Sequence, residues 1–256
     1  MDLKRKPFYL DDTAIEWVNN TLNGLTEDEK IGQLFFQIGF STEKEYLNHL
    51  RSLGIGGLFF RPGVAEEVQQ TYEYMQRTSK VPLLTAANLE DGGNGSSIEG
   101  TAFGNQMAVA ATNQTSDAYT LGKIASSEGK AVGVNFGFSP VVDLDLNFRN
   151  PITNVRTYGS DVERVIKNAK EYIQAFHDNG IMTSIKHFPG DGVDERDQHL
   201  LTSINSLSVD NWEKTFGKVY QELIDFGSKA VMVGQIAFPA YSGDEMPATL
   251  SPQLLQ

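Results

Sequence analysis

Short apolar runs alternate with longer amphipathic stretches along most of the chain. The short runs predict six β-strands, near residues 34–38 and at 55–60, 82–88, 132–143, 183–188 and 229–238. The stretches between them have helical periodicity, at residues 66–78, 116–129, 161–179 and 209–226. Strands that alternate with helices of about 10–20 residues predict βαβ units and a parallel sheet. The pattern therefore predicts an α/β fold.

The ends of this pattern carry helix signals. Thr26 to Glu29 form a capping box, which predicts a helix that leads into the first apolar run. Ser251-Pro252-Gln253-Leu254-Leu255-Gln256 has the form of the first turn of another helix. A closed (β/α)8 TIM barrel needs two more strands than the six counted here. We therefore expect one domain over residues 1–256, a barrel truncated after about six βα units, and a chain that is a fragment of a longer protein.

Composition narrows the classes of partner. The chain of 256 residues has a net charge of −12 and no basic stripe, which argues against nucleic acid as a partner. No apolar run reaches the roughly 18 residues that span a bilayer, and residues 1–12 hold no signal-peptide core. The absence of cysteine excludes thiolate chemistry but does not indicate a compartment. We expect a cytoplasmic protein with no membrane partner.

Polar and glycine-rich segments follow the predicted strands, at residues 90–100, 147–160 and 190–203, where a barrel places its chemistry. The fifth strand would bring Lys186 and His187 to the barrel mouth, where both can donate hydrogen bonds to hydroxyl groups. Asp197 and His199 are two residues apart, so they would point the same way in an extended loop. A carboxylate beside an imidazole orients its ring and favours its protonated form, which could give a proton to a leaving oxygen.

Two plainer interpretations of these residues stay open. Asp197 and His199 could be a solvated pair on a surface loop, which is common for such residues. The two histidines with Asp191 and Asp197 could bind a divalent metal, although no histidines have the spacing of a helical or strand metal motif. We expect no metal and no cofactor. The other histidines, His49 and His177, lie on helical stretches and receive no role.

The segment Lys186-His187-Phe188-Pro189-Gly190-Asp191-Gly192, followed by Asp197-Gln198-His199, resembles the signature of glycoside hydrolase family 3, in its N-acetylglucosaminidase branch. Four further landmarks occur in the family's order, so that the resemblance covers nearly the whole chain. They are residues 26–35, Phe138-Ser139-Pro140-Val141-Val142-Asp143, Asn150-Pro151 with residues 156–161, and the stretch from Val231-Met232-Val233 to Pro247-Ala248-Thr249-Leu250-Ser251.

The resemblance implies a retaining, two-step hydrolysis of terminal β-linked N-acetylhexosamine glycosides, so the expected partner is a carbohydrate. His199, paired with Asp197, would be the general acid/base. The groups expected to hold the sugar are Arg156, Lys186, His187, Asn88 and Asp143. The family's nucleophile is an aspartate after the seventh strand, which we expect beyond Gln256. Asp143 and Asp145 are poor substitutes because Asp143 resembles a structural or hydroxyl-orienting residue. The isolated chain should then be inactive.

The chain departs from the family pattern at three positions. Asp191 stands where the family has a histidine, Asn88 where many members have an aspartate, and Gln235 where a histidine is common. An amide keeps its hydrogen bonds but loses the charge-assisted one. These changes could shift substrate preference. Three alternatives stay open: a family 3 β-glucosidase, which Asp197-Gln198-His199 argues against; a phosphorylase, because a histidine acid/base tolerates phosphate as the attacking anion; and a non-catalytic carbohydrate-binding barrel.

Overall fold

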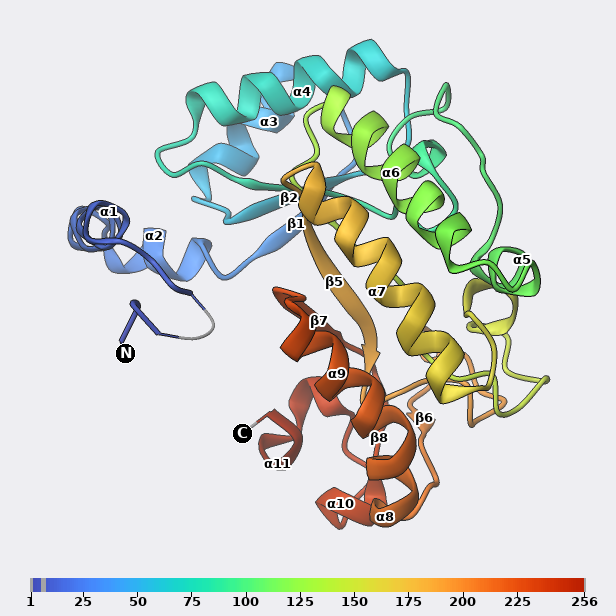
Figure 1. The fold of residues 1–256 in the computed structure, drawn as a ribbon. Coiled ribbons are helices and arrows are strands. Elements are labelled where there is room, and N and C mark those ends of the chain that lie inside the picture. The colour runs from blue at the N-terminus through green and yellow to red at the C-terminus, as the bar shows by residue number, and fades with distance from the viewer. Residues whose placement is uncertain (1, 6–7, 256) are drawn as a thin grey trace.

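A computed structural model describes residues 2–5 and 8–255. Its centre is a sheet of six parallel strands that curls partway into a barrel, with helices on its outer side (Figure 1). The strands are neighbours in the order β1 (Phe36–Gly39), β2 (Gly57–Phe60), β3 (Leu84–Ala87), β4 (Phe136–Gly137), β5 (Met182–Phe188) and β7 (Ala230–Val233). The predicted α/β fold and its truncated barrel are confirmed. The edges of the sheet are β1 and β7.

The long helices follow the strands and cover the outer face of the sheet (Figure 1). They are α3 (Lys44–Ser52), α4 (Ala65–Thr78), α6 (Thr115–Ala131), α7 (Val162–Asp178) and α9 (Lys218–Phe226). At the β1 edge lie α1 (Asp12–Asn23) and α2 (Glu27–Gly32). Short elements fill the connections: α5 (Gln106–Ala111), α8 (Val209–Trp212), α10 (Pro239–Ser242), α11 (Pro252–Leu255), a second sheet of β6 (Ser203–Ile204) and β8 (Ile236–Ala237), and 3-10 turns at Gly93–Gly95, Asn154–Arg156 and Ala248–Leu250.

The helix-start signals predicted from the sequence are confirmed. Thr26 N donates to Glu29 Oε2 at 2.8 Å, and Glu29 N donates to Thr26 Oγ1 at 3.2 Å, which completes the capping box of α2. At the other end, α11 begins at Pro252 as expected. None of the helices in the described ranges is long and apolar enough to cross a membrane.

Three predicted elements are wrong in extent. Only β4 forms within residues 132–143, because Gly133 turns the chain after α6 with φ +93° and Pro140 has no N–H for a ladder. Residues 229–238 divide into β7 and β8, because Gly234 N donates to Phe188 O while β8 pairs with β6. The predicted helix at 209–226 contains a π-helical turn, Glu213–Gly217, between α8 and α9.

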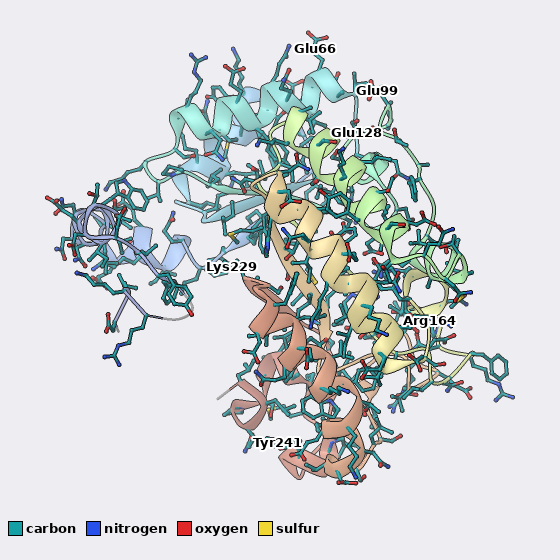
Figure 2. All side chains as sticks on the ribbon, viewed as in Figure 1. Glu66, Glu99, Glu128, Arg164, Lys229 and Tyr241 are labelled. Carbon is teal, nitrogen blue, oxygen red and sulfur yellow. The ribbon has the colours of Figure 1, made fainter. Side chains whose placement is uncertain are left out.

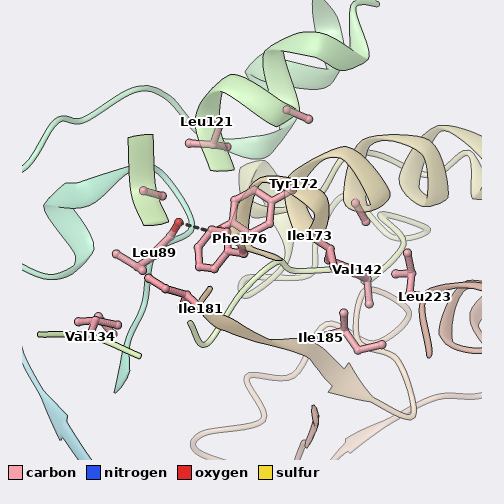
Figure 3. Close-up of a cluster of buried hydrophobic side chains, with 14 of the residues drawn as sticks. Leu89, Leu121, Val134, Val142, Tyr172, Ile173, Phe176, Ile181, Ile185 and Leu223 are labelled. Carbon is pink, nitrogen blue, oxygen red and sulfur yellow. Dashed lines mark hydrogen bonds between the residues drawn. The ribbon is translucent and has the colours of Figure 1, made fainter. Parts of the chain in front are cut away.

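The core lies between the sheet and the outer helices, and it anchors the polar segments that follow the strands. On α7, the rings of Tyr172 and Phe176 stack with centroids 4.7 Å apart. The Tyr172 hydroxyl donates to Leu89 O at 2.8 Å, the contact drawn in Figure 3. Leu89 directly follows Asn88, so this buried bond ties the segment after β3 to α7. Glu66, on α4, points outward and away from the sheet in Figure 2.

Candidate active site

A cavity of about 290 Å³ lies inside the curl of the sheet, among strand residues and the segments that follow the strands. Five of the residues predicted from the sequence line it: Asn88, Arg156, Lys186, His187 and His199. The other lining residues are Phe36, Ile38, Phe59, Phe138, Gln198, Met232, Val233, Gly234 and Gln235. This is the end of a parallel barrel at which ligands bind.

Aromatic rings form one wall of this cavity. The Phe138 ring lies 5.1 Å from that of Phe36 and 5.6 Å from that of Phe59, centroid to centroid. Sequence reasoning placed all three on predicted strands but missed them as cavity residues. The periodicity of such short strands does not show which side chains face the barrel interior.

A cluster of four polar side chains joins the ends of β3 and β5 to the loop after β4. Lys186 Nζ lies 2.6 Å from Glu90 Oε1 and donates to Asn88 Oδ1 at 3.1 Å. Arg156 holds the same Glu90 carboxylate with two bonds, from Nε at 2.8 Å and from Nη2 at 2.9 Å. A fork of this kind sets the plane of the carboxylate as well as its position. Glu90 is therefore the common partner of both cations.

Glu90 was missed as a site residue, although its segment was noted as polar. Two cations predicted to share one pocket need a nearby anion, and this requirement could have identified Glu90 from the sequence. Burial raises the pKa of this carboxyl, but Lys186 and Arg156 outweigh burial and lower it to about 2. Burial lowers the pKa of Lys186, and Glu90 partly opposes that change. The charged forms of Glu90 and Lys186 therefore depend on each other, and that of Glu90 depends also on Arg156.

Asp143 lies behind His187 rather than in the cavity lining. Its side chain is fully buried. Its Oδ2 is 2.7 Å from His187 Nδ1, and its carboxylate also accepts from the backbone N–H groups of His187 and Asp191. If the bonded nitrogen carries the ring proton, the other ring nitrogen of His187 is left for the cavity. Of the two roles that the resemblance offered for Asp143, the contacts match the structural one.

Asp197 and His199 meet through a turn, not through the extended backbone that we expected. Asp197 Oδ1 accepts from His199 N at 2.8 Å, and His199 Nδ1 lies 2.7 Å from the same oxygen. The backbone bond closes an Asx-type turn, which brings the ring over the carboxylate. The two bonds, backbone first, lower the pKa of Asp197. The His199 side chain is 64% exposed, so Nε2 is accessible to a substrate oxygen.

The three departures from the family pattern lie in different places. Asn88 accepts from Lys186 at the cavity wall, and Gln235 lines the cavity beside Gly234. Asp191 is 1% exposed and does not line the cavity. Burial and the neighbouring Asp143 raise its pKa. Asp191 thus lies beneath the cavity and does not place its charge at the surface near His199.

Within residues 2–5 and 8–255, no group of three or more histidine and acidic side chains is placed to hold a metal ion. In the same ranges, no aspartate or glutamate lines the cavity itself. A larger hollow of about 550 Å³ lies near the β1 edge, lined by residues such as Ile31, Phe35 and Leu53. None of the residues that line the smaller cavity lines that hollow. The smaller cavity is the better candidate site because its lining can both bind hydroxyl groups and transfer a proton.

Comparison with known proteins gives consistent matches. The family described as Glycosyl hydrolase family 3 N terminal domain matches residues 26–256. A beta-N-acetylglucosaminidase/beta-glucosidase of Cellulomonas fimi is 47% identical over 256 residues, which are 100% of this chain and 45% of that protein. A solved structure of the beta-glucoside phosphorylase BglX, bound to 2FGlc, has a TM-score of 0.94 at 43% identity and covers 99% of this chain and 48% of that one.

A further solved structure is a glycoside hydrolase family 3 beta-N-acetylglucosaminidase from Paenibacillus, with a TM-score of 0.84 and 28% identity. It covers 90% of this chain, which covers 46% of it. The chain thus spans less than half the length of these relatives.

Proposed function

The chain belongs to the family of glycosyl hydrolase family 3 N-terminal domains, and on this premise we propose that its cavity holds the terminal sugar of a β-linked N-acetylhexosamine glycoside for retaining hydrolysis. One observation carries the proposal. The Asp197–His199 pair, with 2.7 Å between carboxylate and imidazole, stands beside the same cavity that Lys186, His187 and Arg156 line. Proton transfer and hydroxyl binding would therefore act on one bound sugar.

The cations of the cluster keep donors for a sugar. An ammonium group has three N–H donors, and Lys186 uses donors on Glu90 and Asn88. A guanidinium group has five N–H donors, and Arg156 uses three of them on Glu90 and on Ile152 O. The remaining donors can bind sugar hydroxyls, while Glu90 fixes the direction in which both cations point. The aromatic wall supplies the apolar contact of a typical ligand site.

His199 supplies the proton that the leaving oxygen needs. Asp197 holds its Nδ1, so a protonated ring presents Nε2–H outward to the glycosidic oxygen. After that bond breaks, the neutral ring can remove a proton from the attacking water. The first step of a retaining mechanism also needs a carboxylate nucleophile. Because no carboxylate lines the cavity in the described part of the chain, we assign the nucleophile to residues outside it.

Phosphorolysis is a second candidate, favoured by one observation on the site. The cavity lining carries two imidazoles, an ammonium and a guanidinium but no carboxylate in the described ranges, so an anionic acceptor meets little repulsion there. A structure at 43% identity is titled a beta-glucoside phosphorylase. That phosphorylase acts on beta-glucosides by name, and the Cellulomonas fimi relative is named a beta-glucosidase as well as a beta-N-acetylglucosaminidase. Glucosides therefore remain a candidate substrate class.

The test uses protein expressed from the whole reading frame that contains residues 1–256. It would be given 4-nitrophenyl glycosides of β-N-acetylglucosamine and of β-glucose, with and without inorganic phosphate. The proposal expects release of N-acetylglucosamine with its β configuration retained, at a higher kcat/KM than for the glucoside. A sugar 1-phosphate as the main product would establish the second candidate. Sugar binding without turnover of either glycoside would contradict both and leave a carbohydrate-binding barrel.

A further inference from the structure

Gln198 lies between the two residues of the acid/base pair but is buried, with 4% of its surface exposed. Its side-chain amide uses both of its ends. Nε2 donates to Asp191 Oδ2 at 2.6 Å, and Oε1 accepts from Gln235 N at 3.1 Å. Asp191 follows the end of β5, and Gln235 follows the end of β7. The amide therefore bridges the ends of two neighbouring strands under the loop that carries His199.

Both carboxylate oxygens of Asp191 accept hydrogen bonds. Its Oδ1 accepts from Asn150 Nδ2 at 2.7 Å and from Gly192 N at 2.7 Å, and its Oδ2 is left for Gln198. Its own N–H donates to Asp143 Oδ1 at 2.8 Å. A continuous set of contacts thus runs from His187 through Asp143 and Asp191 to Gln198. The sugar-binding and acid/base sides of the cavity are joined through buried groups.

Position 198 leaves little room for another arrangement. A Cβ atom on Gly234 would lie 2.5 Å from Gln198 Oε1, so the backbone of the β7–β8 connection packs directly on the amide. The β5–β7 ladder shifts register between Lys186 and Phe188, beside this bridge. The backbone bond from Gly234 N to Phe188 O already ties this connection to the end of β5, and the Gln198 amide adds a side-chain bridge beside it.

We propose that Gln198 is a positioning residue for His199, and that it forms a matched pair with Asp191, the residue that replaces the family's histidine. This inference rests on the proposed function, because it takes His199 to be the acid/base. The amide donates to the buried carboxylate and accepts from the β7 side, and so holds the turn of Asp197 and His199 at one distance from Lys186 and His187. Asp191 does not line the cavity, and the Gln198 amide that borders it is already bonded at both ends.

Variants that exchange the hydrogen-bond donor and acceptor between positions 191 and 198 test the proposed pair. Gln198→Glu places a carboxylate against Asp191, so the donor is lost and two acceptors face each other. Asp191→Asn with Gln198→Glu reverses the bond: Asn Nδ2 donates to the new carboxylate, while Asn Oδ1 still accepts from Asn150 and Gly192. The remaining Glu oxygen still accepts from Gln235 N. The double variant therefore restores every bond of the pair, with the negative charge moved from position 191 to position 198.

The first readout is the imidazole of His199, followed by long-range proton–nitrogen NMR of residues 1–256 without substrate. Gln198→Glu should shift the His199 ring signals, and the double variant should bring them back toward the wild-type positions. Gln106→Glu is the matched control, because Gln106 is also buried and its amide bridges only Val141 N and O. It should leave the His199 signals in place.

Unchanged His199 signals in Gln198→Glu, an equal shift in Gln106→Glu, or no recovery in the double variant would overturn the inference. If Gln198→Glu does not fold, Gln198→Asn replaces it, because a side chain one methylene shorter cannot reach both partners. In protein from the whole reading frame, kcat should fall about 10- to 100-fold with KM little changed. The NMR readout needs no turnover, so failure of the proposed function would be seen separately.

Discussion

Lys186 Nζ lies 2.6 Å from Glu90 Oε1, and this contact joins the end of β5 to the segment after β3. The Lys186 side chain is 3% exposed and that of Glu90 is 10% exposed, so the ion pair is almost fully buried, and of the two residues only Lys186 lines the cavity. Arg156 completes it from the loop after β4. A pair this deep holds the N–H donors of Lys186 and Arg156 in place, and each member depends on the other for its charge.

Removing Glu90 should therefore destabilise the fold strongly. Glu90→Ala leaves the buried Lys186 ammonium and part of the Arg156 guanidinium without a counter-ion, for an expected loss of about 3–5 kcal/mol. Urea unfolding followed by circular dichroism would measure it. Glu66→Ala, on the exposed side of α4, is the control and should change the free energy of unfolding by under about 0.5 kcal/mol. If Glu90→Ala lowered the free energy of unfolding as little as the control does, the result would contradict the role of Glu90 as a buried counter-ion.

Acid should also remove the stabilisation that the ionised Glu90 side chain gives to the fold. The pKa of Glu90 is about 2 in the folded protein, below its ordinary value of 4.5. A lowered folded pKa stabilises the fold above pH 4.5, and this stabilisation is lost as the pH falls toward about 2. The stability difference between wild type and Glu90→Gln should be roughly 3 kcal/mol at neutral pH and should shrink across that window. A difference that does not vary with pH would show that Glu90 is not held as an ion pair.

The sequence predicted the class of fold and most of the polar side chains that line the cavity. Alternation of strands and helices is a local property that short apolar runs reveal, so all six strands of the main sheet were placed in the right order. The motif from Lys186 to His199 also brought its residues together in space. Glu90 was missed because its role depends on two cations that lie 66 and 96 residues further along the chain.

Two of the errors share one physical origin. Long-range bonds decide where strands end, and no local pattern records them. The stretch 229–238 divides because Gly234 bonds to Phe188 while β8 turns to β6. Asp191 could not be interpreted from the sequence for the same reason, since its partners Asn150 and Gln198 belong to different loops. The roles proposed for the site residues remain predictions.

The β1 edge should promote self-association of residues 1–256. Leu34 is 85% exposed and Phe40 is 75% exposed, at the two ends of a strand that pairs on one side only. Apolar edges of this kind favour contacts between chains. Analytical ultracentrifugation should show a concentration-dependent mass that the double variant Leu34→Lys/Phe40→Lys lowers. The control, Phe148→Lys on a distant exposed loop, should not lower it. A wild type that stays monomeric at all concentrations would refute the prediction.

Residues 1–256 by themselves should not turn over 4-nitrophenyl N-acetyl-β-glucosaminide. The three carboxylates that contact charged or imidazole groups of the cavity lining are already engaged: Glu90 with two cations, Asp143 with His187, and Asp197 with His199. None is free to attack the sugar carbon. Release of 4-nitrophenol would be compared with that of the His199→Ala variant of the same residues. Wild-type turnover well above this variant would mean that one of the three acts as the nucleophile.

The most direct test of the account is the effect of His199→Ala on protein from the whole reading frame. Two substrates would be compared, a disaccharide of N-acetylglucosamine and its 4-nitrophenyl glycoside. The account predicts a fall in kcat/KM of about 100-fold or more on the disaccharide. It predicts a smaller fall on the nitrophenyl glycoside, because 4-nitrophenolate leaves without a proton. His49→Ala, on the exposed side of α3, should change neither. An undiminished rate on the disaccharide in His199→Ala would contradict the account.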